Sequence, residues 1–341
     1  MIALRETPMA SPECGPLVSV VIAVYQGAAL IRGAVRSALN QTHRNIEVLV
    51  VDDGSTDATL EVLATIDDPR VVVLPQANAG TAAARNLALA RARGQYIAFL
   101  DSDDRWFPGK LAAELHVLEH APAPVAIAYS SYYAVDDRGR LLNPAPVRVQ
   151  TGSALDALLD GEDFLMPSVC LFDRTVFDTI GNFNTDRYHE DHEFILRASR
   201  RYTVRPTRER LVAYRQSTAG KCRSILADFE RARAEELSVV SDFAQTLDDG
   251  QRARLRNNAL RSLYCRFLMY GFADHATRLQ AEVDVAALPT NTKGVLAWLF
   301  AKTGINLLTV VRSGVQSYYL LARQRAWRGR LAQSGLELGY D

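Results

Sequence analysis

The first part of the chain alternates between two hydrophobic patterns. Near-continuous apolar runs at 17–25 (LVSVVIAVY) and 46–52 (IEVLVVD) are typical of strands buried on both faces of a sheet. Apolar residues at 79–92 (AGTAAARNLALARA) instead recur every three or four positions, as in an amphipathic helix. Two further strands are predicted, at 70–75 and 95–101. Because strand and helix alternate, residues 17–130 are predicted to form a Rossmann-like, mostly parallel α/β sheet.

The pattern changes beyond residue 130. Strands are predicted at 124–135 and 210–215, and 189–202 (HEDHEFILRASRRY) is predicted to be a helix with an acidic start and a basic end. Strand patterns then stop, and 222–330 favours several helices. The prediction is therefore an α/β catalytic domain at 17–216, with halves 17–130 and 131–216, followed by an all-helical C-terminal region at 217–341.

Composition excludes some classes of protein. The 341 residues include 39 Lys and Arg and 39 Asp and Glu, so a neutral chain gives no bulk attraction to nucleic acid. Four scattered cysteines without a CxxC pair favour reduced thiols over a disulfide framework or a zinc site. Acids and prolines in residues 1–16 interrupt the apolar stretch that a signal peptide needs, so we predict a cytoplasmic protein.

Polar clusters follow three of the predicted strands: AVYQG at 23–27, DDGSTD at 52–57 and DSDD at 101–104. The carboxyl ends of parallel strands meet at one edge of a sheet, where ligands of open α/β folds bind. Carboxylates suit hard cations such as Mg²⁺ and Mn²⁺, which commonly bridge to substrate phosphates. The clusters together favour a crevice that binds a polyanion through a divalent cation.

Other interpretations of these clusters remain. Acids after strands often only form turns, and Ser55 or Thr56 could cap a helix that runs through Leu63. Three carboxylates within 101–104, however, repel one another more than a turn requires. Trp106, beside them, lines a sugar pocket or covers the sheet edge, and the sequence leaves both open.

Motif spacing narrows the enzyme classes. The chain has neither the GxGxxG of a dinucleotide dehydrogenase after its first strand nor the GxxxxGK[ST] of a P-loop. Phosphoryl transfer through an aspartyl intermediate would use an acidic pair after a strand and remains an alternative, although the assisting lysine is not evident.

Four blocks in order resemble family 2 glycosyltransferases of the GT-A fold: VSVVIAVYQG, QTHRNIEVLVVDDGSTD, NAGTAAARNLALARARGQYIAFLDSDD and HEDHEFILRASR. The resemblance covers residues 17–215, and the C-terminal third lies outside it. It implies transfer of a sugar from a nucleotide diphosphate sugar, UDP being favoured, to an acceptor hydroxyl with inversion at the anomeric carbon. The acceptor would be a glycan or a lipid-linked acceptor in cell-surface polysaccharide or glycolipid assembly.

The resemblance also implies the donor-binding residues. Ala23 and Tyr25 match the positions on the first strand that hold the base, by backbone and by ring. Asp53 matches the residue that accepts a hydrogen bond from uracil, and Arg85 matches a basic residue near the nucleotide.

The same comparison implies the groups that carry the chemistry. Asp101 and Asp103 are the acids of the family's DxD, with Asp103 as the direct ligand of Mn²⁺ or Mg²⁺ and Asp101 nearer the ribose or a metal-bound water. Asp191 matches the catalytic base, and Glu190 precedes it. A cation would stabilise the departing diphosphate, and a carboxylate would take the acceptor's proton.

Two plainer interpretations stand beside this one. Acids in the first turn of a helix usually just complement its dipole, and without the family resemblance this would be the preferred account of Asp191. A sugar-nucleotide-binding module that has lost catalysis is the non-enzyme alternative. Such a module is expected to lack the base or the metal acids, and this chain has both.

The C-terminal third contains one unusually apolar segment, 294–311 (GVLAWLFAKTGINLLTVV). It is shorter than the about 20 residues of a membrane span, and Lys302 would cost roughly 2.5–3.5 kcal/mol at its centre. Its polar stripe and the basic tail at 323–330 suit a helix lying on an anionic membrane at the cytoplasmic face. Helices packed on the catalytic domain, with solvated arginines, remain the alternative.

Overall fold

The computed structural model describes residues 15–121, 125–144, 153–160, 164–187, 189–216, 225–243, 245–283 and 327–336. The apolar segment predicted at 294–311 lies outside these residues. None of the described helices combines the length and the hydropathy that a membrane span requires.

The strands of these residues form one nine-stranded mixed sheet. They are β1 (Val18–Val24), β2 (Ile46–Asp52), β3 (Val71–Pro75), β4 (Tyr96–Phe99), β5 (Arg105–Trp106), β6 (Val125–Val135), β7 (Leu141–Pro144), β8 (Cys170–Asp173) and β9 (Thr203–Arg215). Their order is β3-β2-β1-β4-β8-β6-β9-β5, and β7 pairs with β6.

The sheet is parallel in its first half and mixed in its second. β1 pairs in parallel with β2 and β4, and β2 pairs in parallel with β3, as the alternating pattern predicts. β8 then lies antiparallel between β4 and β6, and β5 is antiparallel to β9. Every residue of β2 is buried, which agrees with a strand covered on both faces.

The α-helices follow the strands in the first half and gather in the second. They are α1 (Ile31–Leu39), α2 (Thr59–Ala64), α3 (Thr81–Leu89), α4 (Lys110–His120), α5 (Ala154–Leu159), α6 (Thr175–Ile180), α7 (Glu190–Ser199), α9 (Phe229–Asp242), α10 (Asp249–Met269) and α11 (Ala273–Leu279). The described residues also include the 3₁₀ turns η1 (Pro167–Val169) and η2 (Gln280–Glu282).

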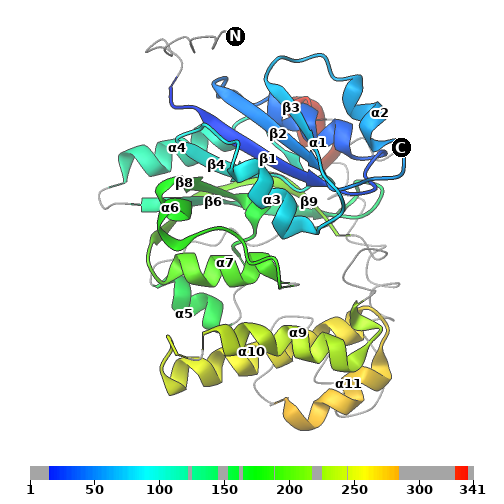
Figure 1. Ribbon diagram of the computed structural model, residues 1–341, viewed down its shortest axis with the longest axis vertical. Helices are drawn as coiled ribbons and strands as arrows, with labels where there is room; N and C mark the ends of the chain where they lie inside the picture. Colours follow the sequence, from blue (N-terminus) through cyan, green and yellow to red (C-terminus); the bar gives the residue numbers. More distant parts are fainter. Residues whose placement is uncertain are drawn as a thin grey trace, which may run out of the picture.

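The helical C-terminal region is confirmed, and it packs directly on the α/β part. Figure 1 shows α5 and α7 between the sheet and the α9–α10 pair. Val239 on α9, Phe243 directly after it and Leu255 on α10 belong to the same hydrophobic core as the sheet. The Arg254 side chain on α10 also donates hydrogen bonds to both carboxylates that α5 carries in its first turn and at its end. The two parts are therefore joined by apolar packing and by ion pairs.

The described end of the basic tail returns to the sheet. Residues 327–334 are helical, and Trp327 is buried against Phe107 and Tyr133. The indole Nε1 of Trp327 donates to the carbonyl oxygen of Gly139 at 3.1 Å. This part of the tail thus packs on the catalytic domain, which supports the packing interpretation for these residues.

The turn after β2 corrects one prediction. α2 begins at Thr59 after Ala58, so capping by Ser55 or Thr56 is wrong. The two hydroxyls instead hydrogen-bond the backbone and side-chain amides of Gln26 in the loop after β1. The turn itself needs Gly54, whose φ is +76° and whose missing Cβ would lie 2.8 Å from a backbone nitrogen of the β3–α3 loop. These polar groups are therefore used to join neighbouring loops.

A buried ion pair connects α4 to the sheet. Lys110 Nζ lies 2.6 Å from Glu114 Oε2, and Ser130 on β6 donates to the other carboxylate oxygen at 2.7 Å. The ammonium also lies 4.3 Å from the ring centroid of Trp106. Burial raises the pKa of Glu114 to about 7 against the opposing effect of Lys110. Each charge in this cluster depends on its partner.

We predict that Lys110→Met lowers the free energy of unfolding by about 3–5 kcal/mol, because it leaves Glu114 buried without its cation. The double variant Lys110→Met/Glu114→Leu should recover most of this loss, since an apolar pair of similar volume replaces the ion pair. Urea denaturation followed by circular dichroism measures both. Equal stabilities of the single and double variants would contradict this account.

Candidate functional site

The acids of the DSDD segment lie directly after β4 and are not equivalent. A hydrogen bond from the backbone N–H of Asp104 to the carbonyl of Asp101 (3.0 Å) closes the turn, and Ser168 Oγ accepts from the backbone N–H of Asp101 (2.8 Å). The side chains of Asp101 and Asp103 are 35% and 36% exposed, whereas Asp104 is fully buried. The carboxylates of Asp101 and Asp103 are thus accessible to a ligand, whereas the carboxylate of Asp104 has a structural role.

Arg215, at the end of β9, holds this acidic turn from the opposite side. Its backbone N–H donates to Asp104 Oδ1 at 2.9 Å, and its guanidinium lies 3.6 Å from Asp103 Oδ2 and 2.8 Å from Asp137 Oδ1. Burial and the charge of Asp101 raise the pKa of Asp103 to about 6, even though Arg215 opposes the shift. Sequence reasoning missed Arg215, and its only signal was its place at the end of a predicted strand.

Arg85 on α3 connects the acids to the second half of the fold. Its Nη2 donates to Asp101 Oδ1 at 2.9 Å, and its Nη1 lies 3.3 Å from Glu190 Oε1 on α7. The guanidinium is almost fully buried over two aromatic rings, those of Phe99 and Phe183. A planar guanidinium can serve two carboxylates at once, which a lysine ammonium does less well. The structure therefore brings Arg85, Asp101 and Glu190 together, although Arg85 and Glu190 are 105 residues apart in the sequence.

Asp191 lies beside this cluster in the first turn of α7. The side chain is half-buried, and its Oδ1 accepts from the backbone N–H of His192 at 2.8 Å. Burial alone would lower the pKa of Arg85, but the charges of Asp101, Glu190 and Asp191 raise it. Asp191 is thus close enough to act on the same cation, while Glu190 is the carboxylate in direct contact with it.

Asp53 is used by the fold in a way that its motif does not reveal. It is buried, and Oδ1 accepts from Gln76 Nε2 (2.7 Å) and from the backbone of Ala79 (2.8 Å). Its Oδ2 accepts from the backbone of Gly80 at 2.9 Å. A carboxylate has about four lone-pair sites, so room for one further donor remains. Asp53 thereby fastens the loop that starts α3.

Ala23 and Tyr25 lie at the end of β1, next to the end of β2. Ala23 is paired with Val51, and the backbone N–H of Asp53 donates to the carbonyl of Val24 at 2.8 Å. Tyr25 is 53% exposed, the most exposed of the three large hydrophobic residues that reach the surface in the described part of the chain. The predicted base-binding residues therefore share one stretch of the sheet edge.

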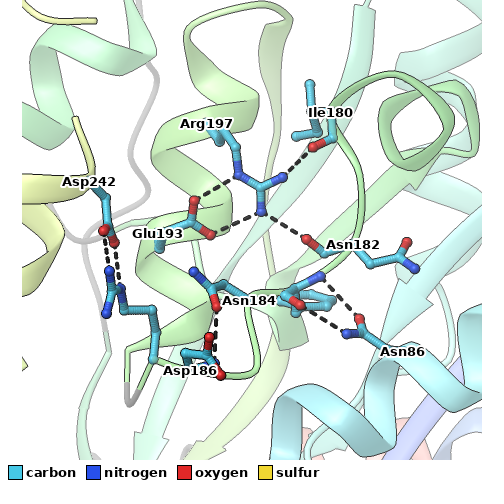
Figure 2. A network of polar contacts seen from close by, with 10 residues as sticks. Asn86, Ile180, Asn182, Asn184, Asp186, Glu193, Arg197 and Asp242 are labelled. Carbon is cyan, nitrogen blue, oxygen red and sulfur yellow. Dashed lines mark hydrogen bonds and ion pairs between the residues drawn. The ribbon is translucent and has the colours of Figure 1, made fainter. Parts of the chain in front are cut away.

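Asn86, the residue after Arg85, was also missed. Its amide nitrogen donates to the carbonyl of Phe183 at 2.8 Å, and its amide oxygen accepts from the backbone N–H of Phe183 at 3.0 Å. Figure 2 shows this pair beside the loop that leads to α7. The loop is held further by Arg197, which donates to Glu193 and to the carbonyls of Ile180 and Asn182. No local sequence pattern marks Asn86, since its partner lies 97 residues away.

The residues that could hold a metal are Asp101 and Asp103. Among the described residues, no three His, Cys, Asp or Glu side chains are arranged as a metal site. Two partly exposed carboxylates nevertheless fit Mg²⁺ or Mn²⁺, which are usually bound by one or two carboxylates with water and substrate phosphates. Burial, and after it the charge of Asp101, raises the pKa of Asp103, and Arg215 opposes this shift only in part. The donor set therefore fits a divalent cation that completes its coordination with water and phosphate oxygens.

A cavity of about 690 Å³ lies elsewhere, along the outer face of α1. Its walls come from α1, from the segment around Trp106 and Pro108, and from 334–336. Within the described part of the chain, none of the predicted site residues lines it. Trp106 is fully buried, and its Nε1 donates to the carbonyl of Ser168 at 2.9 Å, so it covers the sheet edge. The candidate site is therefore assigned to Asp101 and Asp103 because of their carboxylates, and not because of the size of a cavity.

Comparisons with known proteins identify the family of this chain. The sequence profile described as Glycosyl transferase family 2 matches residues 19–181. An uncharacterized glycosyltransferase of Haemophilus influenzae is 34% identical over 186 residues, which cover 53% of this chain and 71% of that protein. The UDP-Glc:alpha-D-GlcNAc-diphosphoundecaprenol beta-1,3-glucosyltransferase WfaP of Escherichia coli is 43% identical over 122 residues, or 36% of this chain. The match spans only 48% of WfaP, about half of its length.

Solved structures give the same fold at low sequence identity. S. aureus TarS 1-349 in complex with UDP-GlcNAc has a TM-score of 0.56 at 17% identity, with 89% of this chain and 91% of that one covered. The mannosyltransferase PcManGT of Pyrobaculum calidifontis, in complex with GDP-Man and Mn²⁺, has a TM-score of 0.54 at 18% identity, with 94% and 85% covered. The likeness confirms the predicted GT-A fold. With a relative matched over most of its length, the chain belongs to glycosyltransferase family 2.

Proposed function

We propose that the protein transfers a sugar from a UDP-sugar to an acceptor hydroxyl with inversion at the anomeric carbon. One observation carries this proposal: Arg85 contacts Asp101 on the donor side and Glu190 beside the predicted base. A donor held at the acids would therefore lie next to Asp191. In a protein that kept this fold only as a binding module, nothing would require the base to stay beside the acids.

The nucleotide is proposed to bind along the ends of β1 and β2. The exposed Tyr25 ring would stack on the base, and the backbone of Ala23 would border it. Asp53 would use its remaining lone pair to accept from N3–H of uracil. The neighbours themselves were solved with UDP-GlcNAc and with GDP-Man, so the fold leaves the base open. The preference for UDP depends on Asp53.

Asp103, with Asp101 beside it, would hold Mn²⁺ or Mg²⁺. The cation would stabilise the negative charge on the departing diphosphate. Arg215 already contacts Asp103 and would remain available to the same phosphates. Arg85 would keep Asp101 in place through its hydrogen bond.

The transfer itself would be a single displacement. The acceptor oxygen attacks the anomeric carbon and forms the new glycosidic bond, while the bond from that carbon to the diphosphate oxygen breaks and UDP leaves with its electron pair. Asp191 takes the proton of the acceptor hydroxyl. Glu190 is occupied by Arg85, which favours Asp191 as the base. Attack from the face opposite UDP gives inversion.

The acceptor is proposed to be a lipid-linked glycan in cell-surface assembly. The name of the E. coli relative gives GlcNAc-diphosphoundecaprenol, a lipid-linked sugar, as the acceptor of that protein. The enzyme would then work in the cytoplasm at the inner face of the membrane. The segment 294–311 would supply contact with anionic lipids, together with Arg328 and Arg330, which stay exposed although the tail packs on the sheet through Trp327. Sedimentation of the full-length protein with anionic vesicles, at low and at high salt, tests this contact. The membrane proposal is wrong if the protein does not sediment with the vesicles at low salt.

Asp103→Asn should abolish the part of UDP affinity that depends on Mn²⁺, a loss of at least about tenfold, because an amide replaces the proposed metal ligand. Isothermal calorimetry with UDP, with and without Mn²⁺, measures it. Asp137→Asn is the matched control, since Asp137 contacts the same Arg215 and is not a proposed ligand. The metal assignment is wrong if both variants keep the Mn²⁺ effect.

Asp191→Asn should reduce turnover by a factor of about 10² or more while UDP affinity stays within about twofold, because the amide keeps the shape but cannot take the proton. A panel of nucleotide sugars, with UDP release as the signal, supplies the donor and the rate. Asp186→Asn, an exposed acid in the preceding loop, is the control and should remain active. Normal turnover in Asp191→Asn with loss in Glu190→Gln would move the base to Glu190.

A further inference from the structure

The helical region touches the segment that leads to the proposed base. Two carboxylates of α9 contact residues just before α7. Arg187 donates from Nε to Asp242 Oδ2 at 2.6 Å and from Nη2 to the other oxygen of the same carboxylate. His189 Nε2 lies 3.1 Å from Glu236 Oε2. Figure 2 shows Asp242 reaching this segment on the side opposite Asn86.

Glu236 is a buried anion at the junction of three helices. Its side chain is 5% exposed, and Arg266 on α10 donates to the same oxygen that His189 approaches. Burial alone would raise the pKa of Glu236, but the charge of Arg266 and the contact with His189 lower it to about 2. Glu236 therefore remains ionised and links α10 through α9 to the start of α7.

His189 is the residue through which this link reaches the base. It is the N-cap of α7, and its carbonyl oxygen accepts the first hydrogen bond of the helix, from the backbone N–H of Glu193 at 3.1 Å. Its side chain does not cap the helix and points instead to Glu236. The first turn of α7, which carries Glu190 and Asp191, is thus oriented by the residue that Glu236 holds.

We propose that Glu236 is a positioning residue for Asp191, and that the helical region acts on the transfer step through the Glu236–His189 contact. The inference rests on the proposed role of Asp191 as base. A base must come within hydrogen-bond distance of the acceptor hydroxyl, and a displacement of about 1 Å can cost on the order of 10² in rate. The donor acids that follow β4 are further from this contact and are joined to α7 through Arg85 and Glu190.

The test is a double-mutant cycle measured with the donor found in the nucleotide-sugar panel. Glu236→Gln and His189→Ala are each made in the wild type and in Asp191→Asn. In the wild type, each should lower kcat by about tenfold or more, with the donor KM within about threefold. In Asp191→Asn, neither should lower the residual rate further, because the group that they position no longer takes a proton.

Glu230→Gln is the matched control. It removes the same kind of carboxylate from the same helix, where Glu230 is paired with Arg278 at 2.6 Å on the surface. It should leave kcat and KM unchanged. Glu236→Gln removes a buried partner of Arg266, so if that variant does not fold, His189→Ala decides the question alone.

Two results would overturn the inference. The first is wild-type kcat in both Glu236→Gln and His189→Ala. The second is an equal fractional loss in the Asp191→Asn background, which would show a general structural effect. Failure of the proposed function has a different signature: Asp191→Asn would itself turn over at the wild-type rate, and the inference would fall with it.

Discussion

A buried cation, the guanidinium of Arg85, joins the two halves of the candidate site. The Arg85 guanidinium lies between Asp101, which follows the fourth strand, and Glu190, which starts α7. A charge this deeply buried is stable only with its partners in place, so the contact constrains both segments at once. The acids of the first half and the carboxylates of the second half are held in one site for this reason.

The surroundings of α3 give Arg85 a fixed position. Asp53 holds the loop before the helix through three hydrogen bonds, and Asn86 holds the loop before α7 through two. The helical region continues this frame from the other side, where Asp242 and Glu236 hold the same approach to α7. The proposed donor acids, the proposed base and the helical region are therefore parts of one connected polar framework that rests on the hydrophobic core of the sheet.

The sequence predicted the elements whose structure depends on burial of nearby residues. The buried runs of β1 and β2 and the periodicity of α3 are set by burial alone, and the sequence showed them. The antiparallel β8 is four residues long, too short for a pattern, and its place comes from packing between β4 and β6. The hydroxyls of Ser55 and Thr56 were misassigned because Gln26, about 30 residues away, competes for them. The contacts of Arg215 and Asn86 were not predicted for the same reason, because their partners are distant in the sequence.

The central claim is that Arg85 serves donor binding and transfer together, and Arg85→Lys tests it most directly. Lysine keeps the charge but not the planar fork that reaches two carboxylates. Thermal unfolding first establishes that the variant is folded. Its affinity for UDP in the presence of Mn²⁺ and its turnover rate at saturating donor should then both fall by about tenfold or more. Arg91→Lys, at an exposed position just beyond α3, should change neither. Loss of only one property, or of neither, in Arg85→Lys would contradict the account.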